Sequence, residues 1–267
     1  MTDPQPLSTS SDDVWQNIRG VFTDIDDTIT TNGRITADVF AAMERLRDAG
    51  LLCVPITGRP AGWCDMIARQ WPVDAVVGEN GAFYFRYDEG ARQMIRSYAD
   101  DADERAEKAE RLQRVRKDIL AEVPGAAVSA DQPFRMSDLA IDFCEDVSPL
   151  DQSEVRRIVE IFERHGATAK VSSIHVNGWF GDFDKLTMTK RMMAEQFAVD
   201  LSTDAHAFTF VGDSPNDAPM FRFFPNAVGV ANLREFLDQC DALPAWITAH
   251  ARGAGFVEFA DRILALK

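Results

Sequence analysis

The sequence lacks long apolar runs, closely spaced cysteines and an excess of positive charge. No segment approaches the roughly 18 to 20 apolar residues that a membrane-spanning helix requires, and the start, MTDPQPLSTSSDD, has neither the basic nor the apolar region of a secretion signal. The four cysteines lie far apart without a C-x-x-C pair, so we expect reduced, mostly buried thiols and no disulfide framework. These absences predict a soluble, cytoplasmic protein.

Acidic residues outnumber basic ones by 43 to 28, which gives a formal net charge of −15. A field of this sign repels polyanions and anionic membranes. We therefore expect neither a nucleic-acid partner nor a membrane partner. The length of 267 residues allows one large domain or two modest ones, and the sequence does not indicate the oligomeric state.

Short apolar runs alternate with helical patterns in the first and last parts of the chain. In the first part, apolar runs lie at 21–23, 51–56 and 75–77. The alternation resumes after residue 185, where a further apolar run lies at 208–211. The order is typical of an α/β protein with a Rossmann-like, doubly wound parallel sheet. Between these parts, short strands of period two and two amphipathic helices predict an inserted α+β domain.

The same patterns indicate where the domains begin and end. We expect a core domain in two parts, residues 14–85 and 183–267, and an inserted α+β domain at 86–182. Residues 1–13 are mostly polar, with few apolar side chains to offset the entropy of ordering, so we expect a flexible tail there.

Polar clusters follow three of the apolar runs. Asp24 and Asp26 follow the first, residues 57–59 (Thr-Gly-Arg) follow the second, and Asp213 and Asp217 follow the run at 208–211. Ligands of open parallel sheets bind beyond the carboxyl ends of the strands, so we expect these clusters to meet. Four carboxylates in one crevice need a cation, and oxygen ligands without His or Cys favour Mg²⁺.

These motifs resemble those of the haloacid dehalogenase superfamily of phosphohydrolases. They are DIDDT at 24–28, Thr57 at the end of VPIT, Lys185 at the start of a helix and GDSPND at 212–217, in the family's order. The resemblance extends to VGVAN at 228–232. The insertion, introduced by ENGA at 79–82, is similar to the cap of the type II, subclass B branch, which includes Cof-type, sucrose-phosphate and mannosyl-3-phosphoglycerate phosphatases.

The resemblance implies a catalytic role for several motif residues. Asp24 would be the nucleophile that forms an aspartyl-phosphate, and Asp26 would protonate the leaving alcohol and then deprotonate the attacking water. Lys185 would neutralise the phosphate and Asp24. Asp24, the backbone carbonyl of Asp26 and Asp213 would hold Mg²⁺, and Asp217 would support them through a water molecule or from behind the direct ligands.

Expected substrate-binding residues come from both the core and the insertion. His175 and Asn177 share a polar face of the last inserted strand with Ser173, and this face either covers the site or is solvated. Arg135 is either a surface arginine or a ligand for a second anionic or hydroxyl group. The expected set, in which Thr57 and the Gly58 amide hold phosphate oxygens, is Thr57, Gly58, Arg59, Asn80, His175, Asn177 and Asn216.

Two positions depart from the commonest family pattern. Asp27 stands where glycine is common, and we expect its side chain to point away from the site into a hydrogen bond with the following loop. Leu186 follows Lys185 where many relatives have glycine, so Lys190 is a competing candidate for the lysine of the site.

The resemblance favours an enzyme, a phosphatase that hydrolyses a small phosphorylated metabolite such as a sugar phosphate or a related polyol or glycerate phosphate. Two alternatives stay open: a phosphomutase or phosphotransferase of the same superfamily, and a non-catalytic aspartate phospho-acceptor. Asp26 disfavours the last one, because an adjacent acid/base group shortens the life of an acyl phosphate.

Overall fold

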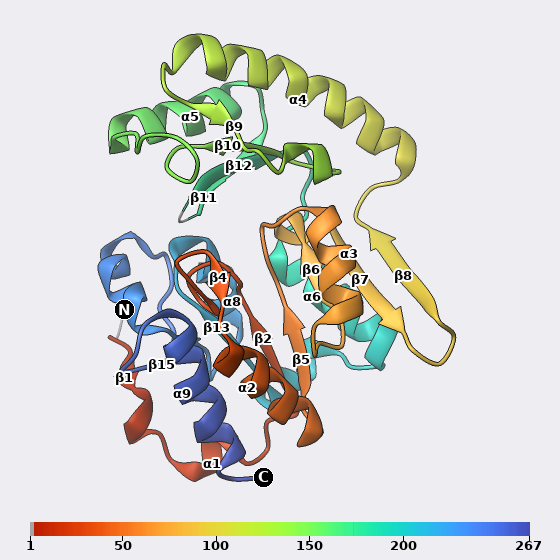
Figure 1. Cartoon of the computed structure of the whole chain (residues 1–267), viewed down its shortest axis with the longest axis vertical. Coiled ribbons are helices and arrows are strands. Elements are labelled where there is room, and N and C mark those ends of the chain that lie inside the picture. The colour runs from red at the N-terminus through yellow and green to blue at the C-terminus, as the bar shows by residue number, and fades with distance from the viewer. Residues whose placement is uncertain (1–2, 173) are drawn as a thin grey trace.

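The computed structural model of this chain describes residues 3–172 and 174–267. Figure 1 shows a larger α/β part that contains both described ends of the chain, and a smaller part packed above it. None of the helices in the described ranges is long and apolar enough to cross a membrane.

The core contains a parallel sheet to which both parts of the chain contribute. Its strands, in spatial order, are β1 (Gln5–Pro6), β15 (Trp246–Ile247), β14 (Val228–Gly229), β13 (Phe208–Gly212), β2 (Gly20–Thr23) and β5 (Leu52–Pro55). The chain leaves β2 toward β5 on one side and returns to β13 on the other, so β2 lies where the strand order reverses. Ligand sites of doubly wound sheets lie at this point, and the sheet confirms the expected Rossmann-like core.

Helices cover both faces of this sheet (Figure 1). The core helices are α1 (Asp12–Trp15), α2 (Ala37–Asp48), α3 (Ala61–Gln70), α6 (Lys185–Phe197), α7 (Leu201–Asp204), α8 (Ala218–Phe223) and α9 (Arg252–Leu264). Val21 and Phe22 of β2 belong to separate hydrophobic clusters, because successive strand residues point to opposite faces. Both faces are buried, which explains the continuous apolar runs of the core strands.

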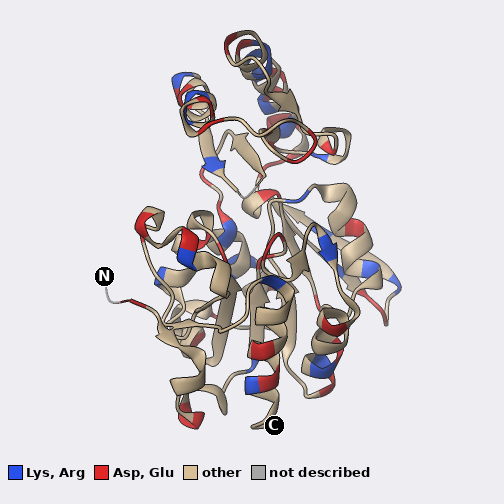
Figure 2. Cartoon of the chain, turned by 60° about the vertical axis from the view of Figure 1, so that its left-hand side comes forward, with Lys and Arg blue, Asp and Glu red and all other residues tan. Residues whose placement is uncertain are grey.

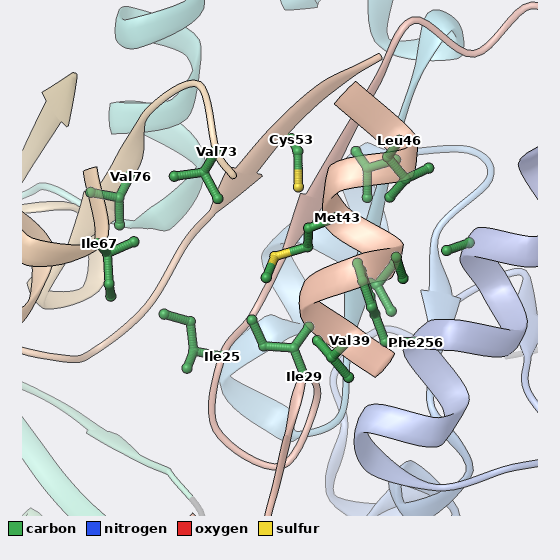
Figure 3. Packing of buried hydrophobic residues seen from close by; sticks show 14 of the residues in the cluster. Ile25, Ile29, Val39, Met43, Leu46, Cys53, Ile67, Val73, Val76 and Phe256 are labelled. Carbon is green, nitrogen blue, oxygen red and sulfur yellow. The ribbon is translucent and has the colours of Figure 1, made fainter. Parts of the chain in front are cut away.

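One of these clusters lies between the sheet and the α2–α9 pair. Figure 3 shows Val39, Met43 and Leu46 on one side of α2, close to Phe256 of α9. Their spacing of three and four residues places them on a single helix face. Cys53 of β5 belongs to the same cluster.

Three of the four thiols are buried, which agrees with the expectation from their spacing. Cys53, Cys64 and Cys240 are the buried ones, and Cys144 is half-buried. Burial raises the pKa of the Cys53 thiol to about 12, so this thiol stays protonated and unreactive near neutral pH.

The N-terminal segment is packed on the core, and the expectation of a flexible tail is wrong for residues 3–13. Gln5 of the edge strand β1 pairs with Trp246 of β15, and the Leu7 side chain is buried. The hydroxyl of Ser10 accepts a 2.7 Å hydrogen bond from Nε1 of Trp15. A polar segment can therefore be ordered by one apolar anchor and the backbone groups of a sheet edge, neither of which composition reveals.

Small antiparallel sheets complete the core. A hairpin of β3 (Thr30–Thr31) and β4 (Arg34–Ile35) follows the first motif, and a sheet of β6 (Val76–Gly78), β7 (Phe83–Asp88) and β8 (Gln93–Tyr98) precedes the insertion. Phe83 and Phe85 stack with ring centroids 4.4 Å apart and belong to a core cluster. The expected domain boundary at residue 86 therefore falls inside a strand that packs with the core.

We place the inserted domain at residues 99–182 and call it the cap. It has a hydrophobic cluster of its own, formed between two helices and one face of a sheet whose other face points toward the core (Figure 1). Its elements are α4 (Ala102–Glu122), β9 (Ala127–Val128), β10 (Leu139–Asp142), α5 (Gln152–Arg164), β11 (Thr168–Val171) and β12 (His175–Trp179). The colours of Figure 2 show that acidic and basic residues alternate along the ribbons of the two helices, as expected for solvated helix faces.

Candidate active site

The strand-end carboxylates meet beyond the carboxyl ends of β2 and β13. Thr23 is aligned with Val211, so Asp24 lies next to the loop that contains Asp213 and Asp217. One carboxylate oxygen from each of the three aspartates lies within 4.8 Å of the other two, and all three residues are buried.

Lys185, the first residue of α6, bridges two of these aspartates. Its Nζ donates to Oδ1 of Asp24 and to Oδ1 of Asp217, at 2.8 Å in both cases. The alternative candidate, Lys190, packs on the ring of Phe223, with Nζ 4.2 Å from the ring centroid. The structure therefore brings Lys185 to the carboxylates, as the sequence predicted.

The cluster carries more negative charge than Lys185 neutralises. Burial raises the pKa of Asp24 to about 7; Lys185 opposes this rise, and the carboxylates of Asp217 and Asp26 add to it. Burial and the neighbouring Asp24 also raise the pKa of Asp213 well above its usual value. A buried, oxygen-only donor set that is short of positive charge fits Mg²⁺.

Two of the carboxylates are held in place by further hydrogen bonds. Oδ2 of Asp217 accepts from the amides of Asp213 and Ser214, at 3.1 and 3.4 Å. Asp213 accepts from Oγ1 of Thr28 at 3.2 Å and from Nδ2 of Asn232 at 3.0 Å. These hydrogen bonds therefore orient both carboxylates. Asn232 lies in a segment that the resemblance included, although it was not predicted as a site residue.

Asp26 points to Arg59. Nε of Arg59 lies 3.0 Å from both carboxylate oxygens of Asp26, and Nη2 lies 2.8 Å from Oδ1. The guanidinium is shared with the cap, because Nη2 also donates to Oε1 of Glu145 at 3.1 Å. Asp26 and Arg59 line the same cavity as Asp24.

Asp27 shows why glycine is common at its position. Its φ is 54°, in the left-handed region that glycine adopts without strain and that aspartate tolerates better than most residues. The side chain is not among those that line the cavity, and its partner is Nε of Arg252 at the start of α9, at 2.8 Å, in place of the following loop that we expected.

Residues 57–59 form a tight turn at one side of the cavity. Oγ1 of Thr57 accepts from the amide of Arg59 at 3.0 Å. A side chain on Gly58 would meet Nδ2 of Asn80 at 3.1 Å, so Asn80 lies directly behind this turn. Gly58 and Arg59 are among the residues that line the cavity, whereas Asn80 is not, which makes Asn80 a support of the turn.

The cap contributes His175 and Asn177 to the cavity, as expected, and the core contributes Asn216. Nε2 of His175 lies 2.9 Å from Oε2 of Glu145, and Nδ2 of Asn177 donates to Asp138 at 2.9 Å. Ser173, expected on the same face, lies outside the described residues. The open choice between a solvated face and a face that covers the site is therefore decided in favour of the second.

Arg135 is a buried arginine and not a surface one. It binds Asp131 at 2.8 Å and Asp138 at 3.0 Å, and it donates to the carbonyl of Gly58 at 2.9 Å. It lines the cavity with its charge already neutralised by two carboxylates.

Sequence reasoning missed the acidic residues at the contact between cap and core. The buried carboxylate of Glu79 accepts hydrogen bonds from the amides of Ala61 in the core and of Met136 and Ser137 in the cap, at 2.6 to 3.1 Å. Burial raises the pKa of Glu79 to about 8; Asp138 adds to the rise and Arg135 opposes it. No local pattern signals these roles, because each carboxylate finds its partner in another part of the chain.

Comparisons with known proteins agree with this arrangement. Residues 21–123 match the family model of the haloacid dehalogenase-like hydrolases. A search of curated proteins found no match.

Solved structures extend the similarity to nearly the whole chain. A Thermoplasma acidophilum protein is 16% identical with a TM-score of 0.68, and the alignment covers 94% of this chain and 99% of that one. A HAD/COF-like hydrolase from Plasmodium vivax is 14% identical with a TM-score of 0.67 and coverages of 94% and 97%. The sucrose-phosphatase of Synechocystis sp. PCC6803 is 14% identical with a TM-score of 0.63 and coverages of 91% and 97%.

At these identities the solved structures show a shared fold and no more. The core sheet, the inserted α+β cap and the order of the motifs are those expected from type II, subclass B of the superfamily. The family model of the haloacid dehalogenase-like hydrolases matches residues 21–123, and the solved structures extend the shared fold to the rest of the chain.

Proposed function

We propose that this protein is a Mg²⁺-dependent phosphatase that hydrolyses a small phosphorylated metabolite through an aspartyl-phosphate on Asp24. The observation that carries the proposal is the buried Asp24, held by Lys185 and grouped with Asp213 and Asp217 beside the cavity. The name of one structural neighbour, the sucrose-phosphatase solved in complex with sucrose and phosphate, supports the same chemistry.

In this proposal Asp24 attacks the phosphorus atom. Lys185 binds Oδ1 of Asp24, which leaves Oδ2 as the attacking oxygen, while its charge compensates the phosphate. The bond from phosphorus to the substrate oxygen breaks as the bond to Asp24 forms. Water then cleaves the aspartyl-phosphate and releases inorganic phosphate.

The side chains of Asp24, Asp213 and Asp217, with the backbone carbonyl of Asp26, would hold Mg²⁺. When bound, the ion would supply positive charge to the carboxylates and to the phosphate oxygens. The added charge would oppose the effect of burial and of the neighbouring carboxylates of Asp217 and Asp26, which raise the pKa of Asp24 to about 7.

Asp26 is the proposed acid and base. It would protonate the oxygen of the departing alcohol and afterwards take a proton from the attacking water. Its carboxylate lines the cavity within reach of a phosphate bound at Asp24. Thr57 and the amide of Gly58 would hold phosphate oxygens from the other side.

The cavity favours an organic group without a second negative charge. Arg59 and Arg135 line it, and both are already paired with carboxylates. His175, Asn177 and Asn216 offer polar groups suited to hydroxyls. A sugar or polyol phosphate is therefore favoured over a glycerate phosphate.

A groove of about 570 Å³ gives the organic group room. It runs between the cap and the core and shares Ser172, Ser214 and Asn216 with the cavity beside Asp24. Phe143, Val155, Val159, Val171 and Phe236 give it apolar walls. An organic group with both hydroxyls and apolar faces, as in a sugar, suits such a mixed lining.

The test is release of inorganic phosphate from a panel of sugar, polyol, glycerate and aryl phosphates, with Mg²⁺ or with a chelator. We expect release to require Mg²⁺ and to fall by about 10³-fold or more in Asp24→Asn, as for loss of other nucleophiles. Asp38→Asn, an exposed aspartate on α2, serves as the matched control and should retain activity.

Release that persists in Asp24→Asn or in chelator would contradict the proposal. Added sugars distinguish the phosphotransferase alternative, because a transferase forms more phosphorylated acceptor than free phosphate. A stable phosphoprotein without turnover would instead indicate the phospho-acceptor alternative.

A further inference from the structure

Arg59 connects the cap to Asp26. Its guanidinium binds both carboxylate oxygens of Asp26 in the core, at 2.8 to 3.0 Å. The same group donates to Glu145 of the cap at 3.1 Å and lies 3.6 Å from Asp131 of the cap. One side chain therefore joins the proposed acid and base to two carboxylates of the other domain.

The site around Arg59 is built to hold a guanidinium. The side chain is only 6% exposed, and its carbon Cζ lies 4.5 Å from the ring centroid of Trp63. A planar fork of donors can bind two carboxylates at once and stack on a ring, which an ammonium group cannot reproduce.

Hydrogen bonds hold the cap segment that contains Glu145 in place. The carboxylate of Asp142 accepts hydrogen bonds from the amides of Cys144, Glu145 and Asp146, at 2.7 to 2.9 Å. The side chain of Glu145 is also 2.9 Å from Nε2 of His175. Glu145 therefore has a defined position relative to the cap sheet, and from that position it binds Arg59 of the core.

We propose that Arg59 is a positioning residue that couples closure of the cap, through Glu145 and Asp131, to the orientation of the Asp26 carboxyl. The inference rests on the proposed function and deepens it. With the cap closed, the guanidinium is fixed from both sides, and Asp26 faces the cavity. When the cap lifts, Arg59 loses its two cap partners, and the Asp26 carboxyl loses the anchor that orients it.

The coupling predicts a difference between substrates. A poor leaving group, such as the alkoxide of a sugar phosphate, needs protonation by Asp26, whereas the phenolate of p-nitrophenyl phosphate departs without it. We expect Arg59→Lys and Glu145→Gln to lower kcat/KM for an alkyl phosphate by about tenfold or more, and for the aryl phosphate by less than about threefold. This parameter reports the steps up to release of the leaving group and leaves out the later attack of water, which uses Asp26 with both substrates. Asp26→Asn should show the same pattern with a larger difference.

The matched control is Arg69→Ala, which removes an arginine of α3 that pairs with Asp65 at 2.9 Å on the surface. It should leave both rates unchanged. A purely structural role for Arg59 would lower both rates by the same factor, and that result, or no loss for either substrate, would overturn the coupling.

A second measurement does not depend on activity. In the same full-length variants, hydrogen exchange is followed in peptides that contain residues 142–146 of the cap and 57–62 of the core. We expect Arg59→Lys to speed exchange in the cap peptide and Glu145→Gln to speed exchange in the core peptide. Rates equal to those of the wild type in both would overturn the coupling even if the protein is a phosphatase. Faster exchange in a protein that releases no phosphate would support the coupling and refute the proposed function.

Discussion

At the scale of single residues, Lys185 neutralises part of the negative charge of the buried carboxylates. It donates to Asp24 and Asp217, and one oxygen of Asp213 lies within 4.8 Å of the same cluster. An uncompensated buried charge costs far more than an exposed one. The lysine is therefore a structural requirement of this site.

We predict that Lys185→Met lowers the free energy of unfolding by about 3–5 kcal/mol in chelator, because it leaves buried carboxylates without their partner. Mg²⁺ should reduce this loss, since it supplies the missing charge to the native state. Urea unfolding with and without Mg²⁺ measures both effects. Lys190→Met, which removes only the contact with Phe223, should cost about 1 kcal/mol or less. Equal losses for the two variants would refute the assignment.

At the scale of elements, the N-terminal segment shows how a short strand depends on one anchor. β1 is exposed on both of its residues, but Leu7, directly after it, is 2% exposed. The anchor keeps the strand at the sheet edge beside β15, where its backbone finds partners.

Leu7→Ala should therefore destabilise the protein by about 2–5 kcal/mol, the usual cost of emptying a buried leucine site. Gln5→Ala, in the exposed strand, should change the stability by no more than about 0.5 kcal/mol. Denaturant unfolding compares the two. If Leu7→Ala lowers the free energy of unfolding by less than about 1 kcal/mol, the segment is not anchored by Leu7 and behaves as the flexible tail that its composition suggests.

The turn at Glu79 to Gly81 is a second element whose behaviour depends on distant partners. Glu79 and Asn80 both have positive φ values, 44° and 54°, which cost energy in residues other than glycine. The hydrogen bonds from Ala61, Met136 and Ser137 to the Glu79 carboxylate hold this turn in place. The turn therefore connects α3 to the cap.

The carboxyl group of Glu79 makes the free energy of unfolding depend on pH. Burial raises the pKa of Glu79 from 4.5 to about 8, so the native state binds its proton more tightly than the unfolded chain does. Stability from this group is present below about pH 4.5 and is lost as the pH rises to about 8. Asp24, with its pKa raised to about 7, acts in the same direction in metal-free protein.

We therefore expect the free energy of unfolding in chelator to fall between about pH 5 and about pH 8. In Glu79→Gln the fall should be less steep, by at most about 1.4 kcal/mol per pH unit, the limit for one proton. Denaturant unfolding at a series of pH values measures the slope, with the exposed Glu163→Gln of α5 as control. An unchanged slope in Glu79→Gln would contradict the assignment.

At the scale of the whole molecule, the cap lies over the carboxyl edge of the core sheet and leaves one groove beside the cavity. Contacts from Glu79, Arg135 and Arg59 hold the two domains together on one side. The groove lies between α5 and β11 of the cap and the segments that follow β13 and β14 in the core, so its width depends on both domains.

Narrowing this groove should act on the organic part of the substrate alone. We expect Val171→Trp to raise KM for a bulky sugar phosphate by about tenfold, equal to about 1.4 kcal/mol, and to leave KM for acetyl phosphate unchanged. Thr168→Trp, an exposed position in the same strand that does not line the groove, is the matched control. An equal rise in KM for both substrates would show that the organic group does not bind in this groove.

The chemistry-bearing end of the core could be predicted from the sequence. Asp24, Asp213, Asp217 and Lys185 follow apolar strands or begin a helix, and the parallel order of these elements requires that they meet. Local patterns are enough here, because each residue's position follows from its own strand and the strands obey one topological rule.

Other features depended on the tertiary structure. Arg59 and Glu145 are separated by 86 residues, and nothing near either one in the sequence indicates that they form an ion pair across the two domains. Burial of Arg135 and ordering of residues 3–13 likewise depend on partners in distant segments. Periodicity and motifs report local conformation and strand ends, whereas the pairing of charges depends on which surfaces the folded chain brings together.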